Sequence, residues 1–350
     1  MKINLQAPIN QLGYGVAGLN ILKALQKKAE VSFFPIGQPQ VTNQEDATAV
    51  RKGMEVASTF DPNAPCIKIW HQNQMAERIG SGKFIGFPIF ELDLFNSTEK
   101  HHLRSCEHLF VCSEWAKKVC LNNLDRGEHR IHVVPLGVDL NLFPVAQPRT
   151  PDGKVIFFNC GKWEIRKGHD ILIEAFKRVA EEYGNVELQM MTTNPFNTPE
   201  ENAKWYQLYN HPRVKFIPRA ETQVEVYNNM TKVDCGVFPS RGEGWNLELL
   251  EMMAAGKHVI ATDYSAHTEF CTQENCGLVP IKDVEPAFDN KWFFGQGNWA
   301  KISNVEIDIL VKKMKNFVES YKPEVNSAGV KTAEKFSWEN TANEILKIIQ

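Results

Sequence analysis

Residues 155–170, VIFFNCGKWEIRKGHD, decide the fold that we expect for this chain. The apolar run Val155–Cys160 has the composition of a buried strand, and it ends at Gly161, where the backbone can turn sharply. A helical pattern begins at His169. The same alternation of short apolar runs and helical patterns recurs along the chain, which predicts parallel sheets covered by helices on both faces.

The strand-like runs fall into two groups, separated by the polar, proline-containing stretch 143–154, which is typical of a linker. The first group is Lys2–Ala7, Val31–Pro35, Cys66–Trp70, Phe84–Phe90, His108–Cys112 and Ile131–Pro135, and the second is Val155–Cys160, Val186–Thr193, Val214–Ile217, Cys235–Phe238 and His258–Asp263. Helical patterns lie between them, such as Val16–Lys28, His169–Tyr183, Val224–Met230 and Leu247–Ala255. We therefore expect an α/β protein of two Rossmann-like doubly wound domains facing a cleft, residues 1–148 and 149–336, with a last amphipathic helix at 337–350.

Composition narrows the class of protein. The chain has 350 residues, 43% of them hydrophobic, and a net charge of −3. Residues 1–150 carry 16 Lys/Arg and 14 Asp/Glu, so they have no strong nucleic-acid signature. The eight cysteines form no C-x-x-C pair and lie mostly in apolar runs, which indicates buried thiols in a reducing compartment. We find no signal peptide and no apolar run of about 20 residues, and we expect a cytoplasmic protein.

The loop after Val155–Cys160 concentrates positive charge. Lys162, Arg166 and Lys167 lie close together, just before the helix that begins at His169. Cations at a helix N-terminus suit a pyrophosphate and can stabilise a departing nucleoside diphosphate. A solvated basic loop explains the same residues equally well.

A second loop, PSRGEGWNLELLE at 239–251, follows the strand-like run Cys235–Phe238. Glu243 lies between glycines, and Gly244 and Asn246 fit a tight loop whose N–H groups can face a ligand. Glu251 lies in an apolar helical pattern, where a carboxylate needs a partner; the two hydroxyls of a ribose would serve. The alternative is a helix with a surface glutamate at each turn.

A G-x-G-x-x-G pattern occupies Gly13–Gly18, after the first strand-like run. We reject an NAD site, because the end of the second strand, Phe33–Gln38, has no acidic residue to hold the ribose. Gly13 and Gly15 are instead expected to line the cleft beside the donor phosphates or sugar.

Other polar and aromatic residues leave alternatives open. Glu91 and Asp93 imperfectly resemble a metal-binding D-x-D pair, but we expect no metal site. His71 is either a cleft residue or a capping imidazole. Trp292 and Trp299 form either a lid or sugar platform, or an ordered surface loop with packed aromatic rings.

Together, these residues resemble the retaining glycosyltransferases of family 4, which have the GT-B fold. The resemblance covers most of the chain and is strongest over Val155–Phe270. The family motif G-R-x-x-x-x-K-G is matched by Gly161-Lys162 and Lys167-Gly168, with lysine in place of arginine. Glu243 and Glu251 match its E-x7-E motif, and Glu243-Gly244-Trp245-Asn246 its E-G-F-G start. Further matches are Val134–Asp139, Met253–Gly256, Val259–Thr262 and Glu269.

The resemblance implies roles for individual residues. Lys162 and Lys167 would bind the diphosphate, Glu251 the ribose, and Glu243 the transferred sugar. Trp245, Asn246 and Leu247, with Gly161 and Gly244, would bring backbone N–H groups to the donor. The base would lie against Ile217-Pro218-Arg219, and helix 337–350 would pack back on the first domain.

One position departs from the family pattern. Many members carry a histidine near the reacting carbon, where this chain has Glu91 in the segment Phe87–Asp93. A carboxylate there would either stabilise an oxocarbenium-like centre or position the acceptor hydroxyl. The catalytic candidates are thus Glu91, Glu243, Lys162 and Lys167.

We expect a hexosyltransferase that moves a hexose from a UDP- or GDP-linked donor to an acceptor hydroxyl with retention, without metal or cofactor. The donor is a co-substrate. The acceptor stays open among glycan, lipid, protein and modified nucleic-acid base, as does peripheral membrane contact. Alternatives are a GT-B-fold sugar-nucleotide epimerase and a non-catalytic module that binds nucleotide or glycan.

Overall fold

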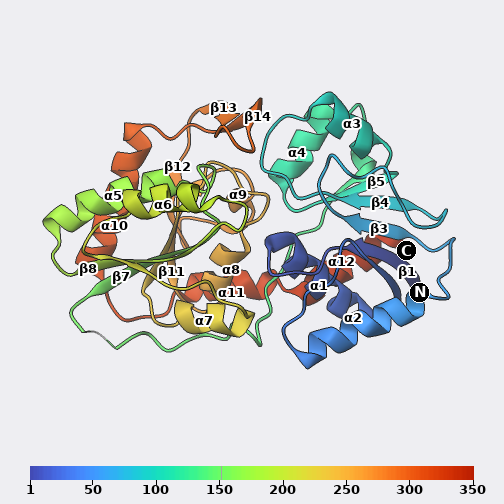
Figure 1. Cartoon of the computed structure of the whole chain (residues 1–350), viewed down its shortest axis with the longest axis horizontal. Coiled ribbons are helices and arrows are strands. Elements are labelled where there is room, and N and C mark those ends of the chain that lie inside the picture. The colour runs from blue at the N-terminus through green and yellow to red at the C-terminus, as the bar shows by residue number, and fades with distance from the viewer. Residues whose placement is uncertain (151) are drawn as a thin grey trace. The chain divides into compact units, whose positions relative to one another are not determined.

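The computed structural model describes residues 1–150 and 152–350 (Figure 1). Contacts divide the chain into unit 1, which is Met1–Gly137 with Phe336–Gln350, and unit 2, which is Val138–Lys335. The division lies before residue 148, because residues of the expected linker belong to unit 2. The N–H of Ala146 donates to the carbonyl of Ala255 at 3.1 Å, and the rings of Phe143 and Tyr227 are 6.0 Å apart. Pro151, which the linker 143–154 includes, lies outside the described residues.

Unit 1 is built on a parallel six-stranded sheet in the order β2-β1-β3-β4-β5-β6. Its strands are β1 (Lys2–Ala7), β2 (Glu30–Pro35), β3 (Cys66–Ile69), β4 (Phe84–Phe87), β5 (His108–Val111) and β6 (Ile131–Val133). Its helices are α1 (Gly13–Gln26), α2 (Gln44–Ala57), α3 (Ser97–Arg104), α4 (Glu114–Asn123), the short 3-10 helix Glu128–Arg130 and α12 (Trp338–Ile349). Strands β3 and β4 are buried along their whole length, as strands covered on both faces must be.

The last helix, α12, is part of unit 1, although the chain reaches it only after unit 2. Its buried face, which includes Ala342 and Ile345, packs with α1. Ser337 caps its first turn by accepting from the N–H of Asn340 at 3.2 Å, and the Thr341 hydroxyl donates to the carbonyl of Pro135 at 2.8 Å. A β-carbon at Gly137 would lie 2.2 Å from the backbone nitrogen of Trp338, so only glycine allows this close approach.

Unit 2 repeats the architecture with a parallel sheet in the order β12-β11-β10-β7-β8-β9. Its strands are β7 (Val155–Gly161), β8 (Val186–Thr192), β9 (Val214–Phe216), β10 (Cys235–Phe238), β11 (His258–Asp263) and β12 (Gly277–Pro280). Its helices are α5 (His169–Glu182), α6 (Pro199–Leu208), α7 (Gln223–Met230), α8 (Leu247–Ala254), α9 (His267–Phe270), α10 (Asn304–Ser320) and α11 (Ser327–Lys335). Apolar side chains of β7, β8, α5 and α10 form a hydrophobic core in unit 2, with Phe157 and Phe176 fully buried.

Strand and helix ends differ by a few residues from the expectation at several places, β12 was not predicted, and two further differences have a clear physical reason. Strand β4 ends at Phe87, so Pro88 to Phe90 belong to the following loop, where proline cannot donate a ladder hydrogen bond. The polar stretch 289–300 is largely strand: β14 (Phe294–Ala300) pairs antiparallel with β13 (Val284–Phe288). This hairpin escaped prediction because its glycines and polar residues weaken the alternating pattern.

Three further expectations bear on the whole chain. The eight cysteines are buried thiols, and no disulfide joins them in the described residues, as their apolar surroundings predicted. None of the helices described is long and apolar enough to cross a membrane. In residues 1–150 and 152–350, no three side chains of His, Cys, Asp or Glu gather closely enough to hold a metal ion.

Candidate functional site

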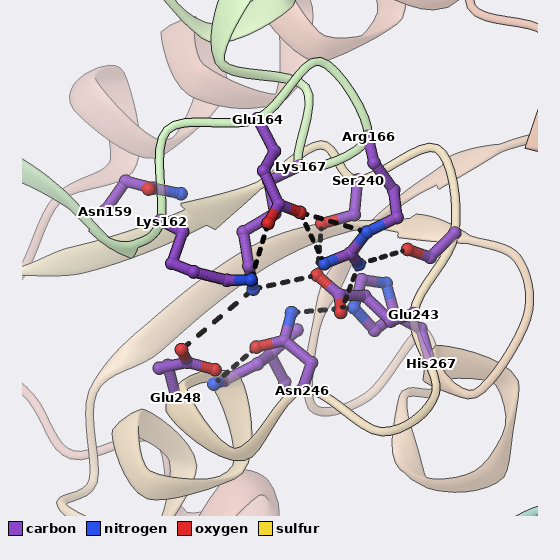
Figure 2. Close-up of polar contacts among 12 residues, drawn as sticks. Asn159, Lys162, Glu164, Arg166, Lys167, Ser240, Glu243, Asn246, Glu248 and His267 are labelled. Carbon is purple, nitrogen blue, oxygen red and sulfur yellow. Dashed lines mark hydrogen bonds and ion pairs between the residues drawn. The ribbon is translucent and has the colours of Figure 1, made fainter. Parts of the chain in front are cut away.

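Two loops of unit 2 meet at one edge of its sheet. The loop 162–168 follows β7, and the loop 239–246 follows β10, the neighbouring strand. Because the carboxyl ends of parallel neighbours lie at the same edge, residues far apart in sequence come together there. The N–H of Arg241 donates to the carbonyl of Arg166 at 2.7 Å, which joins the two loops directly. Figure 2 shows the polar side chains that gather between them.

Glu243 is the centre of this cluster, and both of its carboxylate oxygens have protein partners. Oε1 lies 3.1 Å from Nζ of Lys167 and accepts from the Ser240 hydroxyl at 2.9 Å. Oε2 accepts from Nη1 of Arg166 at 2.9 Å. Burial by itself would raise the pKa of Glu243, but Lys167 and Arg166 outweigh it and hold that pKa well below its usual range. Glu243 is therefore a fixed negative charge.

Glu164 is a second buried anion in the cluster, and our sequence analysis missed it. Its Oε1 lies 2.8 Å from Nζ of Lys162, and its Oε2 accepts from Nη2 and Nε of Arg166 at 2.7 and 3.1 Å. Burial would raise its pKa, but Arg166 and Lys162 lower it to about 2. The charge sequence Lys162-x-Glu164-x-Arg166 was the signal that could have revealed it, since an acidic residue between two basic ones can pair with both.

The three cations differ in what remains free for a ligand. Arg166 is buried, and its guanidinium donates hydrogen bonds to Glu164, to Glu243 and to the carbonyl of Gly242. Lys167 is also buried, and although burial alone would lower its pKa, Glu243 and Glu248 raise it above its usual value. Lys162 keeps a third of its side chain exposed. Lys162 is therefore the most accessible of the three cations, Lys167 is held by Glu243, and Arg166 joins the two loops.

Two glycines allow the first loop to take this path. Gly161 has a φ of +131° and Gly168 a φ of +70°, which side chains rarely adopt. A β-carbon at Gly168 would also lie 2.0 Å from the carbonyl oxygen of Pro239, in the second loop. The absence of a side chain at Gly168 thus allows the close approach of the two loops, and Gly168 is the N-cap residue of α5.

Two buried histidines that the sequence analysis did not single out form hydrogen bonds with the loops. His169 accepts from the N–H of Glu164 at Nδ1 (3.2 Å), and its Nε2 lies 3.0 Å from Oδ1 of Asn159. Burial, followed by Lys167, lowers the pKa of His169 to about 3, so it is neutral. Nε2 of His267 lies 2.9 Å from Nδ2 of Asn246, and its Nδ1 faces the carbonyl of Thr262 at 2.9 Å.

Asn246 begins α8 in a left-handed conformation, with a φ of +80°. Its side chain accepts from the N–H of Leu249 at 3.2 Å, which caps the helix. Trp245 beside it is buried, with its ring 4.9 Å from that of Phe270. Gly244 and Leu247 are buried in the same turn. The first turn of α8 thus lies at the sheet edge beside Glu243, where its N–H groups carry a partial positive charge.

Glu251 is the other glutamate of the pair, one turn farther along α8 than Glu248. It is only 6% exposed. Within the described residues no group donates a hydrogen bond to its carboxyl, and burial, with a smaller effect of Glu248, raises its pKa to about 8. A buried carboxyl with a strongly raised pKa is a candidate for ligand binding.

The remaining predicted residues lie elsewhere. Ile217 and Arg219 lie just after β9, two strands from β7. The N–H of Ile217 donates to the carbonyl of Met190 at 2.9 Å, and Arg219 is exposed. Gly13, Gly15 and Glu91 belong to unit 1.

In unit 1 the G-x-G-x-x-G pattern forms the first turns of α1, and Gly15 has a packing role of its own. A β-carbon at Gly15 would lie 2.3 Å from the backbone nitrogen of Asn10, whereas one at Gly13 would meet nothing within 4 Å. Between them, Tyr14 donates its hydroxyl to the carbonyl of Ile89 at 2.6 Å, and its ring is 4.6 Å from that of His71. Burial and then the charge of Glu91, which belongs to the loop after β4, raise the pKa of Tyr14.

The chain was compared with known proteins. Residues 153–291 match the family model described as "Glycosyl transferases group 1". The D-inositol 3-phosphate glycosyltransferase of Xylanimonas cellulosilytica is 31% identical over 146 residues, 38% of this chain and 34% of that protein. The mannosylfructose-phosphate synthase of Agrobacterium fabrum is 26% identical over 228 residues, 55% of this chain and 49% of that protein. The chain thus spans half or less of the length of these relatives.

Solved structures match over the whole chain. Alr3699/HepE from Anabaena, solved with UDP and glucose, superposes with a TM-score of 0.69 at 16% identity, covering 99% of this chain and 98% of that one. At this identity the likeness shows the fold. The chain therefore has the GT-B fold, and residues 153–291 of its second unit match the glycosyl transferases group 1 model, in agreement with the resemblance of its motifs.

Proposed function

We propose that this protein transfers a hexose from a UDP- or GDP-linked donor to an acceptor hydroxyl, with retention of the anomeric configuration. The observation that carries the proposal is the pair of lysines, Lys162 and Lys167, held beside the first turns of α5 and α8 by the carboxylates of Glu164 and Glu243. A preorganised cluster of cations and helix N-termini stabilises the negative charge that develops on a leaving diphosphate.

The donor would be held from three sides. Lys162 and Lys167 donate to the diphosphate, and the N–H groups of Gly244 to Leu247 approach the phosphate or the sugar. Glu251 accepts from the two ribose hydroxyls, which supplies the donors that its buried carboxyl lacks among the described residues. Ile217 and Arg219 lie against the base. The UDP in the Anabaena structure favours a uridine donor over a guanosine one.

The reaction would need no metal ion, because the lysines neutralise the diphosphate as it leaves. The bond between C1 of the hexose and the diphosphate oxygen breaks on the face from which the acceptor hydroxyl attacks, and the hydroxyl proton passes to the departing diphosphate. Glu243 contacts the transferred sugar from a position fixed by Arg166 and Lys167. Glu91, from unit 1, either stabilises the anomeric centre or positions the acceptor.

A thermal-shift panel of UDP, GDP, ADP, UDP-glucose, GDP-mannose, NAD and NADP tests the donor site. A ligand at a hundred times its dissociation constant adds about 2.7 kcal/mol of stability. We expect one nucleoside diphosphate to stabilise wild type and the control Glu174→Gln, an exposed carboxylate on α5, but not Glu251→Ala. Stabilisation by NAD or NADP alone overturns the proposal.

Turnover distinguishes the remaining classes. Turnover of the donor at the same rate with and without EDTA supports a reaction that needs no metal ion. Strict dependence of turnover on Mn²⁺ contradicts it. Interconversion of a sugar nucleotide by the protein alone indicates an epimerase. Tight donor binding with no turnover on any acceptor indicates a binding module.

A further inference from the structure

Unit 2 contains a pocket of about 380 Å³ that the donor site does not use. Its walls come from Trp163 to Ile165, from α6 with the preceding Asn197, and from the tip of the β13–β14 hairpin, residues 289–292. We propose that this pocket binds a neutral sugar unit of a glycan. The volume lies in the range of small-ligand sites, which are typically about 300–1,000 Å³.

The pocket adjoins the donor loop but is separate from the donor residues. Lys162, Lys167, Glu243 and Glu251 do not line it. Glu164 is common to both, because its carboxylate holds Lys162 and Arg166 while the residue forms part of the pocket wall. A ligand in the pocket therefore lies next to the loop that would carry the diphosphate without competing for the same side chains.

Aromatic faces are the first feature that suits a sugar. Trp163 and Trp205 stack with ring centroids 5.3 Å apart and planes only 7° from parallel; Trp163 is buried, so Trp205 is the ring of this pair that stays partly accessible. Across the pocket Trp292 is 45% exposed, and the ring of Phe196 lies 5.9 Å from it, edge to face. A ligand that covers the exposed part of this indole gains roughly 25 cal/mol for each Å² of apolar surface that it removes from water. The C–H face of a pyranose is such a cover.

Trp292 is exposed, yet the hairpin tip that carries it is fixed. Oδ1 of Asp289 accepts from the N–H groups of Lys291, Trp292 and Phe293 at 2.9, 2.8 and 2.9 Å. Nζ of Lys291 donates to Oε2 of Glu201 at 2.5 Å and to Oδ1 of Asn197 at 2.8 Å, which ties the tip to the start of α6. A surface held in its binding geometry loses less entropy when a ligand binds.

The charges around the pocket are largely satisfied within the protein. Glu201 pairs with Lys291, Glu164 with Lys162 and Arg166, and Asp289 with backbone N–H groups. A phosphate or nucleic-acid ligand would meet the three carboxylates of Glu164, Glu201 and Asp289 in the same lining. The side chains of Asn197, Asn290 and Lys204 provide the donors and acceptors that hydroxyl groups require. This balance favours an uncharged polyhydroxyl ligand.

If the protein is a glycosyltransferase as proposed, this pocket indicates the class of its acceptor. The acceptor would be a glycan whose reacting hydroxyl lies some distance from the sugar unit bound in the pocket. The rival occupant is a membrane, because the same hairpin exposes Phe288 and Phe294, at 54% and 63%. Phe294 does not line the pocket, so it provides a matched control.

The full chain is screened on an array of neutral glycans, and the strongest binder is titrated against wild type, Trp292→Ala and Phe294→Ala by isothermal calorimetry. We expect Trp292→Ala to weaken binding at least tenfold and Phe294→Ala to change it less than twofold. Lys204→Ala, on the opposite wall, is expected to weaken binding without touching the hairpin. Circular dichroism confirms that each variant is folded.

Absence of binding to every neutral glycan overturns the inference, as does equal loss of binding in Trp292→Ala and Phe294→Ala. Binding to phosphatidylcholine–phosphatidylglycerol vesicles that both substitutions abolish assigns the hairpin to a membrane instead. UDP binding is measured on the same samples. If UDP binds and glycans do not, only this inference fails; if glycans bind at Trp292 and no nucleotide binds, only the proposed function fails.

Discussion

Nζ of Lys167 lies 3.1 Å from Oε1 of Glu243, and both side chains are buried where the loops after β7 and β10 meet. The two residues are 76 positions apart in sequence. Their pairing joins the two motifs of unit 2 into one site, so the integrity of the proposed donor site depends on the folding of unit 2.

Breaking this pair should destabilise unit 2. Glu243→Gln leaves Lys167 and Arg166 buried with one anion fewer, and loss of one partner of a buried pair costs about 3–5 kcal/mol. The double variant Glu243→Gln with Lys167→Met should cost less than the sum of the single substitutions, because both partners are then removed. Urea unfolding followed by circular dichroism measures the free energies. The matched control is Glu182→Gln, an exposed partner of Lys315 worth at most about 1 kcal/mol. Additive effects would mean that the two residues are not coupled.

Glu251 should give the protein a pH-dependent stability. Its pKa is raised to about 8, above the value of an unfolded glutamate, so the folded state binds the proton more tightly. The stabilisation is complete below the unfolded pKa, near 4.5, and is lost as pH rises through 8. Thermal melts of wild type and Glu251→Gln between pH 5 and 9 check this. The melting temperatures should converge or cross toward pH 9, and parallel curves would show that Glu251 does not titrate there.

Donor binding should strengthen as pH rises toward 8, whereas the free energy of unfolding falls over the same range. Ribose hydroxyls donate to the ionised carboxylate, so binding a nucleoside diphosphate lowers the pKa of Glu251 and releases a proton below pH 8. Calorimetry in phosphate and in Tris, which differ in ionisation enthalpy, measures the released proton. Glu251→Gln should abolish the difference between the buffers; proton release that survives this substitution would point to another group.

Gly168→Ala should lower stability strongly. Its φ of +70° is unfavourable for alanine, by about 1–2 kcal/mol, and the β-carbon would lie 2.0 Å from the carbonyl oxygen of Pro239. Gly184→Ala is the control, because nothing lies within 4 Å of its β-carbon and its φ is not in the positive range. Differential scanning calorimetry should show a fall of several degrees for the first variant only. Equal melting temperatures would mean that the loops can move apart at no cost.

Two substitutions of Asn246 should separate the effect of its side-chain hydrogen bonds from the effect of its left-handed backbone conformation. Asn246→Gly keeps the left-handed conformation but removes the contact with His267 and the cap on Leu249, whereas Asn246→Ala also adds backbone strain. We expect a loss of about 1 kcal/mol for Gly, within the range for lost caps, and a larger one for Ala. Urea unfolding measures both. A more stable alanine variant would contradict the left-handed conformation.

Much of the fold could be predicted from local patterns. Strands β1, β10 and β11 begin and end at the residues that the sequence predicted, because their apolar runs are short and bounded by turn residues. The β13–β14 hairpin could not be predicted, since Gly295 and Gly297 interrupt its alternation and its tip is held by Lys291 bonding to α6. Glu164 was missed for a similar reason: its importance comes from Arg166, whose other partner is Glu243 on another loop.

The sequence by itself determined the alternation of strands and helices and the identity of the charged and glycine residues after β7 and β10, because both depend on periodicity and residue type over short distances. Tertiary structure alone decided which of those charges pair. Arg166 and Glu243, 77 residues apart, meet only because β7 and β10 are neighbours. The same holds for the pocket between α6 and the hairpin, whose walls lie nearly a hundred residues apart and come together only through side-chain packing and hydrogen bonds.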